Sequence, residues 1–110
     1  LTYYGTFPSE VDEKDYFAFE LSSSRSVEIW LTNIPSGHDY DLALYDDALN
    51  RLAWSHEDSS GDEHIVTEEL PPARYYIQVI NYGAGGSTQP YHLRVVYDDS
   101  GKEKKPRFYR

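Results

Sequence analysis

The sequence predicts an all-β domain, an antiparallel jelly-roll-like β-sandwich of about eight strands. Apolar residues recur at every second position in short runs, which is the pattern of antiparallel strands with one face toward solvent. Clusters of Ser, Gly, Pro and Asp separate these runs, and such clusters are typical of turns. The spacing of about 3.6 residues that marks an amphipathic helix is nearly absent.

The first half of the chain contains strands expected at residues 1–6, 16–21, 27–31, 42–45 and 52–55. The third is the clearest, because Val27, Ile29 and Leu31 alternate with outward-facing residues. Turns are expected between the strands where small and polar residues gather, at 22–24, 35–37 and 46–47.

The second half contains strands expected at residues 63–68, 75–80 and 91–97, with loops at 58–61, 71–72 and 83–86. Because neighbouring side chains of a strand point to opposite faces, one side of each strand forms the core. The predicted core comprises Phe17, Phe19, Val27, Ile29, Leu31, Leu42, Leu44, Ile77, Val79, Leu93 and Val95.

The length of 110 residues corresponds to one domain with one core. We place the sandwich at residues 1–97 and interpret 98–110, which is charged, basic and contains Gly and Pro, as a tail or linker. The chain has no cysteine, so its stability must come from packing without disulfides. No signal sequence opens the chain, and we expect it to be a piece of a longer, processed protein.

The charge limits the partners. The chain carries 19 acidic and 10 basic residues, a net charge of -9, which argues against binding to nucleic acid or to an anionic membrane surface. No apolar run reaches the length of a membrane span. The acidic charge excludes little beyond these two classes of partner.

The stretch DYDLALYD, residues 39–46, sets carboxylates against apolar residues in one strand. Asp39 and Asp41 share a face, so they repel each other unless a cation or water lies between them. We interpret both as structural. One is expected in the turn after Gly37, bonded to the backbone, and the other on the solvent-exposed surface of the strand.

Two other sets of residues are candidates for chemical sites. Ser55 and His56 have the residue types of a catalytic triad, but neighbours in a strand face opposite ways and no nucleophile elbow is present. His56, Glu63 and His64 have the residue types of a metal site, yet their spacing matches no helical zinc motif. The loop 58–63 lacks the ligand spacing of an EF-hand. No catalytic residues are expected.

Aromatic residues offer the best candidates for a binding surface. Eleven tyrosines and two tryptophans exceed what a small core holds, so some rings are expected on the surface. Alternation points Trp30, Tyr45 and Tyr76 outward, where they could form a flat apolar platform for a ligand. The facing of Trp54 cannot be assigned.

Six segments read in order resemble the bacterial pre-peptidase C-terminal domain. They are DEKDYFAFEL, VEIWL, DYDLALYD, LAWSHEDSSGDEHI, RYYIQV and PYHLRVVY, within residues 12–97. The sequence departs from the family pattern at Ala73-Arg74, where Gly-Thr is usual, and only residues 1–11 precede the first motif. The resemblance implies a jelly-roll-like sandwich appended to secreted proteases and other extracellular hydrolases, without catalytic residues of its own.

The same resemblance extends distantly to clostridial collagen-binding domains. In those relatives calcium is held by an upstream acidic segment together with two aspartates before the first aromatic strand, and Asp12 and Asp15 match that pair. The resemblance therefore implies calcium as a candidate cofactor at Asp12 and Asp15.

Two functions follow as expectations. The first is a secreted, extracellular accessory domain that assists folding, secretion or substrate targeting of a hydrolase, with the catalytic domain as its partner. The second is a stand-alone module that binds fibrous, collagen-like protein or polysaccharide through exposed aromatic residues.

Overall fold

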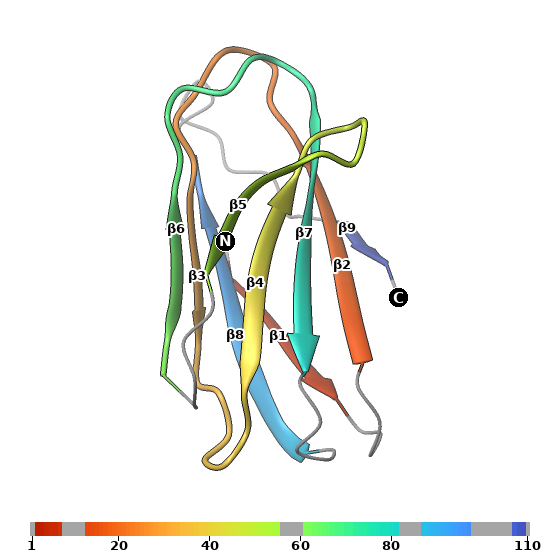
Figure 1. Cartoon of the computed structure of the whole chain (residues 1–110), viewed down its shortest axis with the longest axis vertical. Helices are drawn as coiled ribbons and strands as arrows, with labels where there is room; N and C mark the ends of the chain where they lie inside the picture. Colours follow the sequence, from red (N-terminus) through yellow and green to blue (C-terminus); the bar gives the residue numbers. More distant parts are fainter. Residues whose placement is uncertain (1, 8–12, 56–60, 82–86, 98–106, 110) are drawn as a thin grey trace.

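The computed structural model describes residues 2–7, 13–55, 61–81, 87–97 and 107–109, which form two antiparallel sheets packed face to face (Figure 1). Sheet A has the strand order β1 (Thr2–Phe7), β8 (Ser87–Val96), β3 (Glu28–Thr32) and β6 (Glu63–Val66). Sheet B has the order β5 (Arg51–Ser55), β4 (Tyr40–Tyr45), β7 (Arg74–Asn81), β2 (Glu13–Glu20) and β9 (Arg107–Tyr109).

The connections between the sheets follow the jelly-roll pattern. β1, β3, β6 and β8 lie in sheet A, while β2, β4, β5 and β7 lie in sheet B, so the chain crosses repeatedly between the two layers. In the part of the chain that is described, no residue is helical and no helix could span a membrane. The predicted fold class is confirmed.

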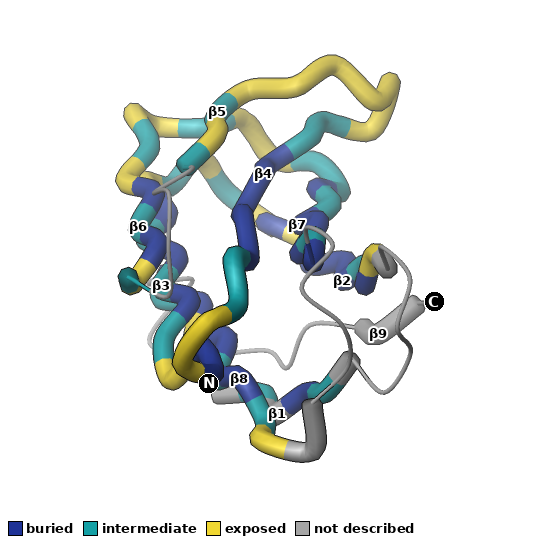
Figure 2. Tube along the Cα trace, turned by 60° about the horizontal axis from the view of Figure 1, so that its bottom comes forward, coloured by how far each residue is buried: buried dark blue, intermediate teal, exposed yellow. Residues whose placement is uncertain are grey.

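The core lies between the two sheets, where the buried trace is concentrated in Figure 2. All eleven residues that alternation assigned to the core are at most 4% exposed. Four tyrosines join them, which explains part of the high tyrosine content: Tyr40, Tyr75, Tyr91 and Tyr97. Aromatic rings stack inside the core, since Phe19 lies 5.6 Å from the ring centroids of both Tyr75 and Tyr97.

Two polar contacts join the sheets inside this apolar layer. The hydroxyl of Tyr91 in β8 donates to Asp15 Oδ2 in β2 at 2.5 Å, and Asp15 is fully buried. At the β5–β6 side, Ser55 Oγ donates to Glu63 Oε2 at 2.6 Å. A buried carboxylate is unfavourable without hydrogen-bond donors, and each of these two hydroxyl groups supplies one from the opposite sheet.

The segment expected as a tail contributes β9, which the sequence did not predict. β9 pairs antiparallel with β2, placing Phe108 opposite Phe17 in the register. Without it β2 would form the edge of sheet B, and an unpaired edge offers a row of hydrogen-bonding groups to any extended segment.

Candidate functional site: an aromatic pocket on sheet B

The outer face of sheet B is built from rows that mix rings with small or short side chains. In one row Gln78 of β7 lies between Tyr16 of β2 and Ala43 of β4. In the next row Tyr76 lies between Ala18 and Tyr45. Both alanines are 2% exposed, so they form a floor from which the neighbouring rings rise.

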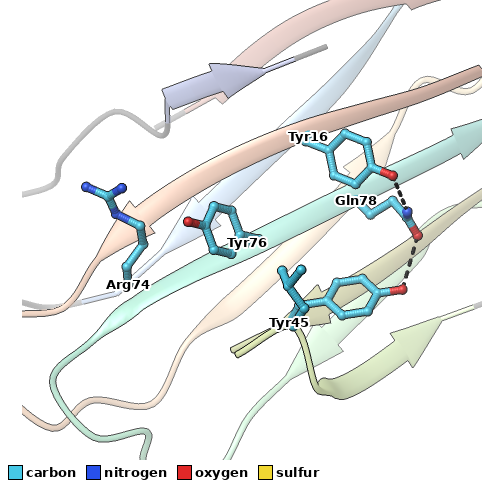
Figure 3. A pocket seen from close by; sticks show the side chains of 6 residues that line it. Tyr16, Tyr45, Arg74, Tyr76 and Gln78 are labelled. Atoms are coloured by element: carbon cyan, nitrogen blue, oxygen red, sulfur yellow. Dashed lines mark hydrogen bonds between the residues drawn. The ribbon is translucent and has the colours of Figure 1, made fainter. Parts of the chain in front are cut away.

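This alternation creates a pocket with a volume of about 670 Å³. The volume lies within the usual range for small-ligand sites, about 300–1,000 Å³. The lining residues come from three strands and one hairpin: Tyr16, Tyr45, Leu49, Arg74, Tyr76 and Gln78. Figure 3 shows Tyr16, Gln78 and Tyr45 side by side, with Tyr76 and Arg74 following along β7.

The polar groups of the wall bond mainly to one another. Tyr45 donates its hydroxyl hydrogen to Gln78 Oε1 at 3.3 Å, and Gln78 Nε2 donates to the Tyr16 hydroxyl at 2.9 Å (Figure 3). Arg74 donates to Glu20 Oε1 from Nη2 at 2.6 Å and from Nε at 3.1 Å. These hydrogen bonds from Arg74 to Glu20, and one to Tyr76, raise the pKa of the Arg74 guanidinium.

The hairpin between β4 and β5 supplies one rim of the pocket and extends across β7 in Figure 1. Asp46 Oδ1 accepts hydrogen bonds from the backbone N–H groups of Ala48 and Asn50, at 3.0 and 2.8 Å. These bonds lower the pKa of Asp46, the bond from Asn50 most of all. These hydrogen bonds fix the conformation of the turn, in which Leu49 is 67% exposed to solvent.

Trp54, whose facing the sequence left open, lies on the same outer face. It pairs with Ala43 in the register, and Arg51 lies over its ring with Cζ 4.4 Å from the centroid. A bulge between the β5 partners of Leu44 and Tyr45 brings Arg51 and Trp54 to one side of the strand. The aromatic surface thus continues from the pocket to the β5 edge.

Trp30 lies on the outer face of sheet A, so the three predicted rings do not form one platform. Its ring stacks on His64, with centroids 3.4 Å apart and planes at 11°. His64 Nε2 in turn donates to Glu28 Oε2 at 3.0 Å, and this bond lowers the pKa of Glu28. The structure brings Tyr45 and Tyr76 together on sheet B, whereas Trp30 and its cross-strand partner His64 both lie on sheet A.

The aspartates of the DYDLALYD stretch are placed differently from expectation. Asp41 faces outward as predicted, but it is only 5% exposed, so the predicted solvent exposure is wrong. β4 is an interior strand, and Asp41 has a short side chain that lies beside Ile80 of β7 in the register. The turn before Asp39 is closed by the His38 N–H donating to the Pro35 carbonyl, and Asp39 Oδ1 has no partner among the described residues.

The fold separates the described candidates for a catalytic triad or a metal site. Ser55 bonds to the fully buried Glu63, while His64 faces the opposite side of β6 against Trp30. His56 lies outside the described residues. Across the described ranges, His and acidic side chains nowhere gather in threes around a metal-sized space.

The calcium prediction concerns two residues of which one is described. Asp15 is buried and accepts the Tyr91 hydroxyl, whereas Asp12 lies outside the described part of the chain. Calcium takes about six to eight oxygen ligands, and the Asp15 carboxylate alone could supply only one or two of them. Because Asp12 is not described, the calcium site stays a prediction.

Sequence reasoning missed four of the six lining residues. Alternation in 74–80 and 16–21 places Tyr16, Arg74 and Gln78 on the outer face, and this signal could have found them. Leu49 had no such signal, since its position depends on the conformation of the hairpin.

The two-sheet jelly roll with a surface pocket defines a β-sandwich module. A profile of the bacterial pre-peptidase C-terminal domain matches residues 13–81, and the chain belongs to this family. Domains of this family are non-catalytic accessory domains, typically associated with secreted peptidases.

Among solved structures, the chain is similar to the pre-peptidase C-terminal domain of collagenase from Bacillus anthracis. The match has a TM-score of 0.69 and 19% identity, and it covers 87% of this chain and 88% of that one. At this identity the likeness supports the fold alone. None of the curated proteins matches the chain.

Proposed function

We propose that this chain is a secreted, non-catalytic accessory domain of a bacterial hydrolase, and that it directs the catalytic partner to a polymeric substrate by binding through the sheet B pocket. The observation that carries the targeting role is the pocket itself, in which Tyr16, Tyr45 and Tyr76 surround a floor of small side chains. Rings that are rigid and partly exposed bind ligands at a low cost in conformational entropy.

Family membership supports the accessory role and the extracellular location. The Bacillus anthracis domain belongs to a collagenase, which makes fibrous protein one reasonable class of polymer to test. The absence of cysteine is compatible with this role, because the core and the cross-sheet contacts stabilise the domain without disulfides. A peptidase domain in the complete reading frame is the expected partner, and a reading frame without a hydrolase would contradict the accessory role.

Retention on insoluble polymers tests the targeting role. The unaltered domain, Tyr76→Ala and Trp30→Ala are incubated with collagen fibres, chitin and cellulose, and the bound fraction is measured after sedimentation. We expect retention on one polymer, a loss of about tenfold or more in affinity for Tyr76→Ala, and little change for Trp30→Ala, which lies on the other sheet.

The two substitutions are matched because each removes one outward ring from a central region of a sheet. If only Trp30→Ala loses retention, the binding surface lies on sheet A and not at the sheet B pocket. No retention of the unaltered domain on any polymer would refute substrate targeting, leaving assistance in folding or secretion as the role to examine.

A further inference from the structure

We propose that the sheet B pocket takes an apolar side chain of an extended polypeptide and not a sugar ring, and that Leu49 is the residue that sets this specificity. The inference rests on the proposed binding role of the same pocket. It is carried by the backbone and exposure of Leu49, by the pairing of the polar wall groups, and by the charge around the rim.

Both the backbone conformation and the solvent exposure of Leu49 are unfavourable for a leucine. Its φ is 64°, in the left-handed region that leucine rarely adopts and that glycine or asparagine occupies readily. Its side chain is nevertheless 67% exposed and does not join the core. Neither the backbone conformation nor core packing favours a leucine at this position, and we infer that its hydrocarbon contacts a ligand in the pocket it lines.

The hairpin holds Leu49 in this position rigidly. The carboxylate of Asp46 accepts from two backbone N–H groups and from Asn50 Nδ2, and the Leu49 N–H donates to the Asp46 carbonyl at 3.0 Å. An exposed loop without such bonds would place the leucine in many positions. A preorganised rim keeps the entropic loss on binding small.

The walls are suited to hydrocarbon. Gln78 is engaged on both its oxygen and its nitrogen by the flanking tyrosines, and Arg74 is engaged by Glu20. A sugar ring carries several hydroxyl groups, and the Tyr16 hydroxyl hydrogen is too little to replace the water that all of them would lose on burial here, which is unfavourable. An aliphatic side chain has no such requirement.

One hydroxyl group remains suited to a peptide backbone. Tyr16 accepts from Gln78 Nε2, so it keeps its own hydrogen to donate. The carbonyl groups of an extended polypeptide lie along its length, where this donor can reach one of them.

The hairpin side of the rim is acidic. Asp47 is exposed beside Leu49, and the whole chain carries a net charge of -9, whereas Glu20 at the other end is paired with Arg74. Charge complementarity therefore favours a polypeptide with lysine or arginine beside the inserted residue, on the hairpin side.

The test is an NMR titration of the chain with four probes. One is a blocked Gly/Ser peptide with a central leucine flanked by lysines, the second carries serine in place of the leucine, and the others are cellohexaose and chitohexaose. We expect saturable shifts of the β2, β4 and β7 amide signals with the leucine peptide, and affinity at least about tenfold weaker for the other three. Added salt should weaken binding of the leucine peptide.

Leu49→Asn is the decisive variant, with Leu52→Asn as its matched control. Asparagine accepts the left-handed backbone but lacks the hydrocarbon, so Leu49→Asn should weaken binding of the leucine peptide about tenfold while raising the melting temperature. Leu52 is also an exposed leucine, at 43%, but it does not line the pocket, and its replacement should leave the affinity unchanged.

Each other outcome overturns the proposal. Equal binding of a hexaose, or unchanged affinity of Leu49→Asn, refutes the polypeptide specificity while the proposed targeting role stands. Shifts of pocket signals that grow with protein concentration alone would identify a second copy of the chain as the occupant and also refute it. If none of the probes shifts the pocket signals and no insoluble polymer retains the domain, the proposed targeting role fails as well.

Discussion

At the scale of single residues, Asp46 makes the β4–β5 hairpin sensitive to acid. Hydrogen bonds from Asn50 and Ala48 lower the pKa of its carboxyl below the usual value of 3.8. A lowered folded-state pKa adds stability that is fully present above the unfolded value and is lost as the pH falls through the folded value. The stabilisation by Asp46 should thus be constant at neutral pH and decline below about pH 3.8.

Urea unfolding at several pH values measures this effect. The difference in unfolding free energy between the unaltered chain and Asp46→Asn should be largest near neutral pH and should shrink below pH 3.8. Asn is a matched change because its side-chain oxygen still accepts hydrogen bonds but does not titrate. A difference that stays the same down to about pH 2.5, where the Asp46 carboxyl of the unfolded chain is largely protonated, would contradict the assignment.

Leu42 tests the assignment of faces in β4. It is fully buried between the sheets, so Leu42→Ala should lower the unfolding free energy by about 2–5 kcal/mol through lost burial and a cavity. Leu52→Ala, at a site that is 43% exposed, should change it by less than about 0.5 kcal/mol. Equal effects of the two substitutions in thermal or urea unfolding would show that the core has been misplaced.

At the scale of elements, alternation predicted the strands that have one buried face. In and just before β3, buried residues alternate with partly exposed ones: Val27, Ile29 and Leu31 face the core. This is the period of two that alternation in the sequence predicts for a strand between core and solvent. Alternation failed for the outward residue Asp41, because burial on the outer face depends on neighbouring strands that are distant in sequence. Leu49 was missed for a related reason, since its contact with the pocket depends on the turn that Asp46 fixes.

β9 was not predicted because its stability comes from its partner and not from its own sequence. A three-residue segment in a charged stretch has no usable periodicity, but the open edge of β2 provides hydrogen-bonding groups for it. The pairing, not the composition, decides the structure of this segment.

Removal of residues 107–110 tests the role of β9. The N–H groups of β2 that face β9 should exchange with deuterium faster, because they lose their strand partner. The N–H groups of β4, which lies between β5 and β7, serve as the internal control and should be unaffected. Unchanged exchange throughout residues 16–18 would show that β9 does not protect this edge in solution.

At the scale of the whole molecule, the two layers are joined through the core and by polar contacts such as that between Asp15 and Tyr91. The resemblance to calcium-binding relatives concerns this same end of β2, where Asp12 and Asp15 precede the aromatic part of the strand. A cation held there would tie the beginning of β2 to other oxygen ligands. Calcium should accordingly stabilise the whole sandwich.

We expect calcium to raise the unfolding free energy by mass action. For a dissociation constant near 1 mM, which is usual for extracellular sites, about 10 mM calcium adds roughly 1.4 kcal/mol. Differential scanning calorimetry with and without calcium measures the shift, and magnesium at the same concentration serves as the control for ionic strength. Asp12→Asn should abolish the shift without changing the stability of the calcium-free chain.

Asp15→Asn separates the structural role of Asp15 from its role in calcium binding. Because Asp15 is fully buried and accepts the Tyr91 hydroxyl, its replacement should lower stability even without calcium, by about 1–3 kcal/mol for a disturbed buried hydrogen bond to a charged group. Tyr91→Phe removes the same bond and keeps the carboxylate, so it should lose stability but retain the calcium shift. If the calcium shift survives in both Asp12→Asn and Asp15→Asn, the ion binds elsewhere and the two aspartates serve the strand alone.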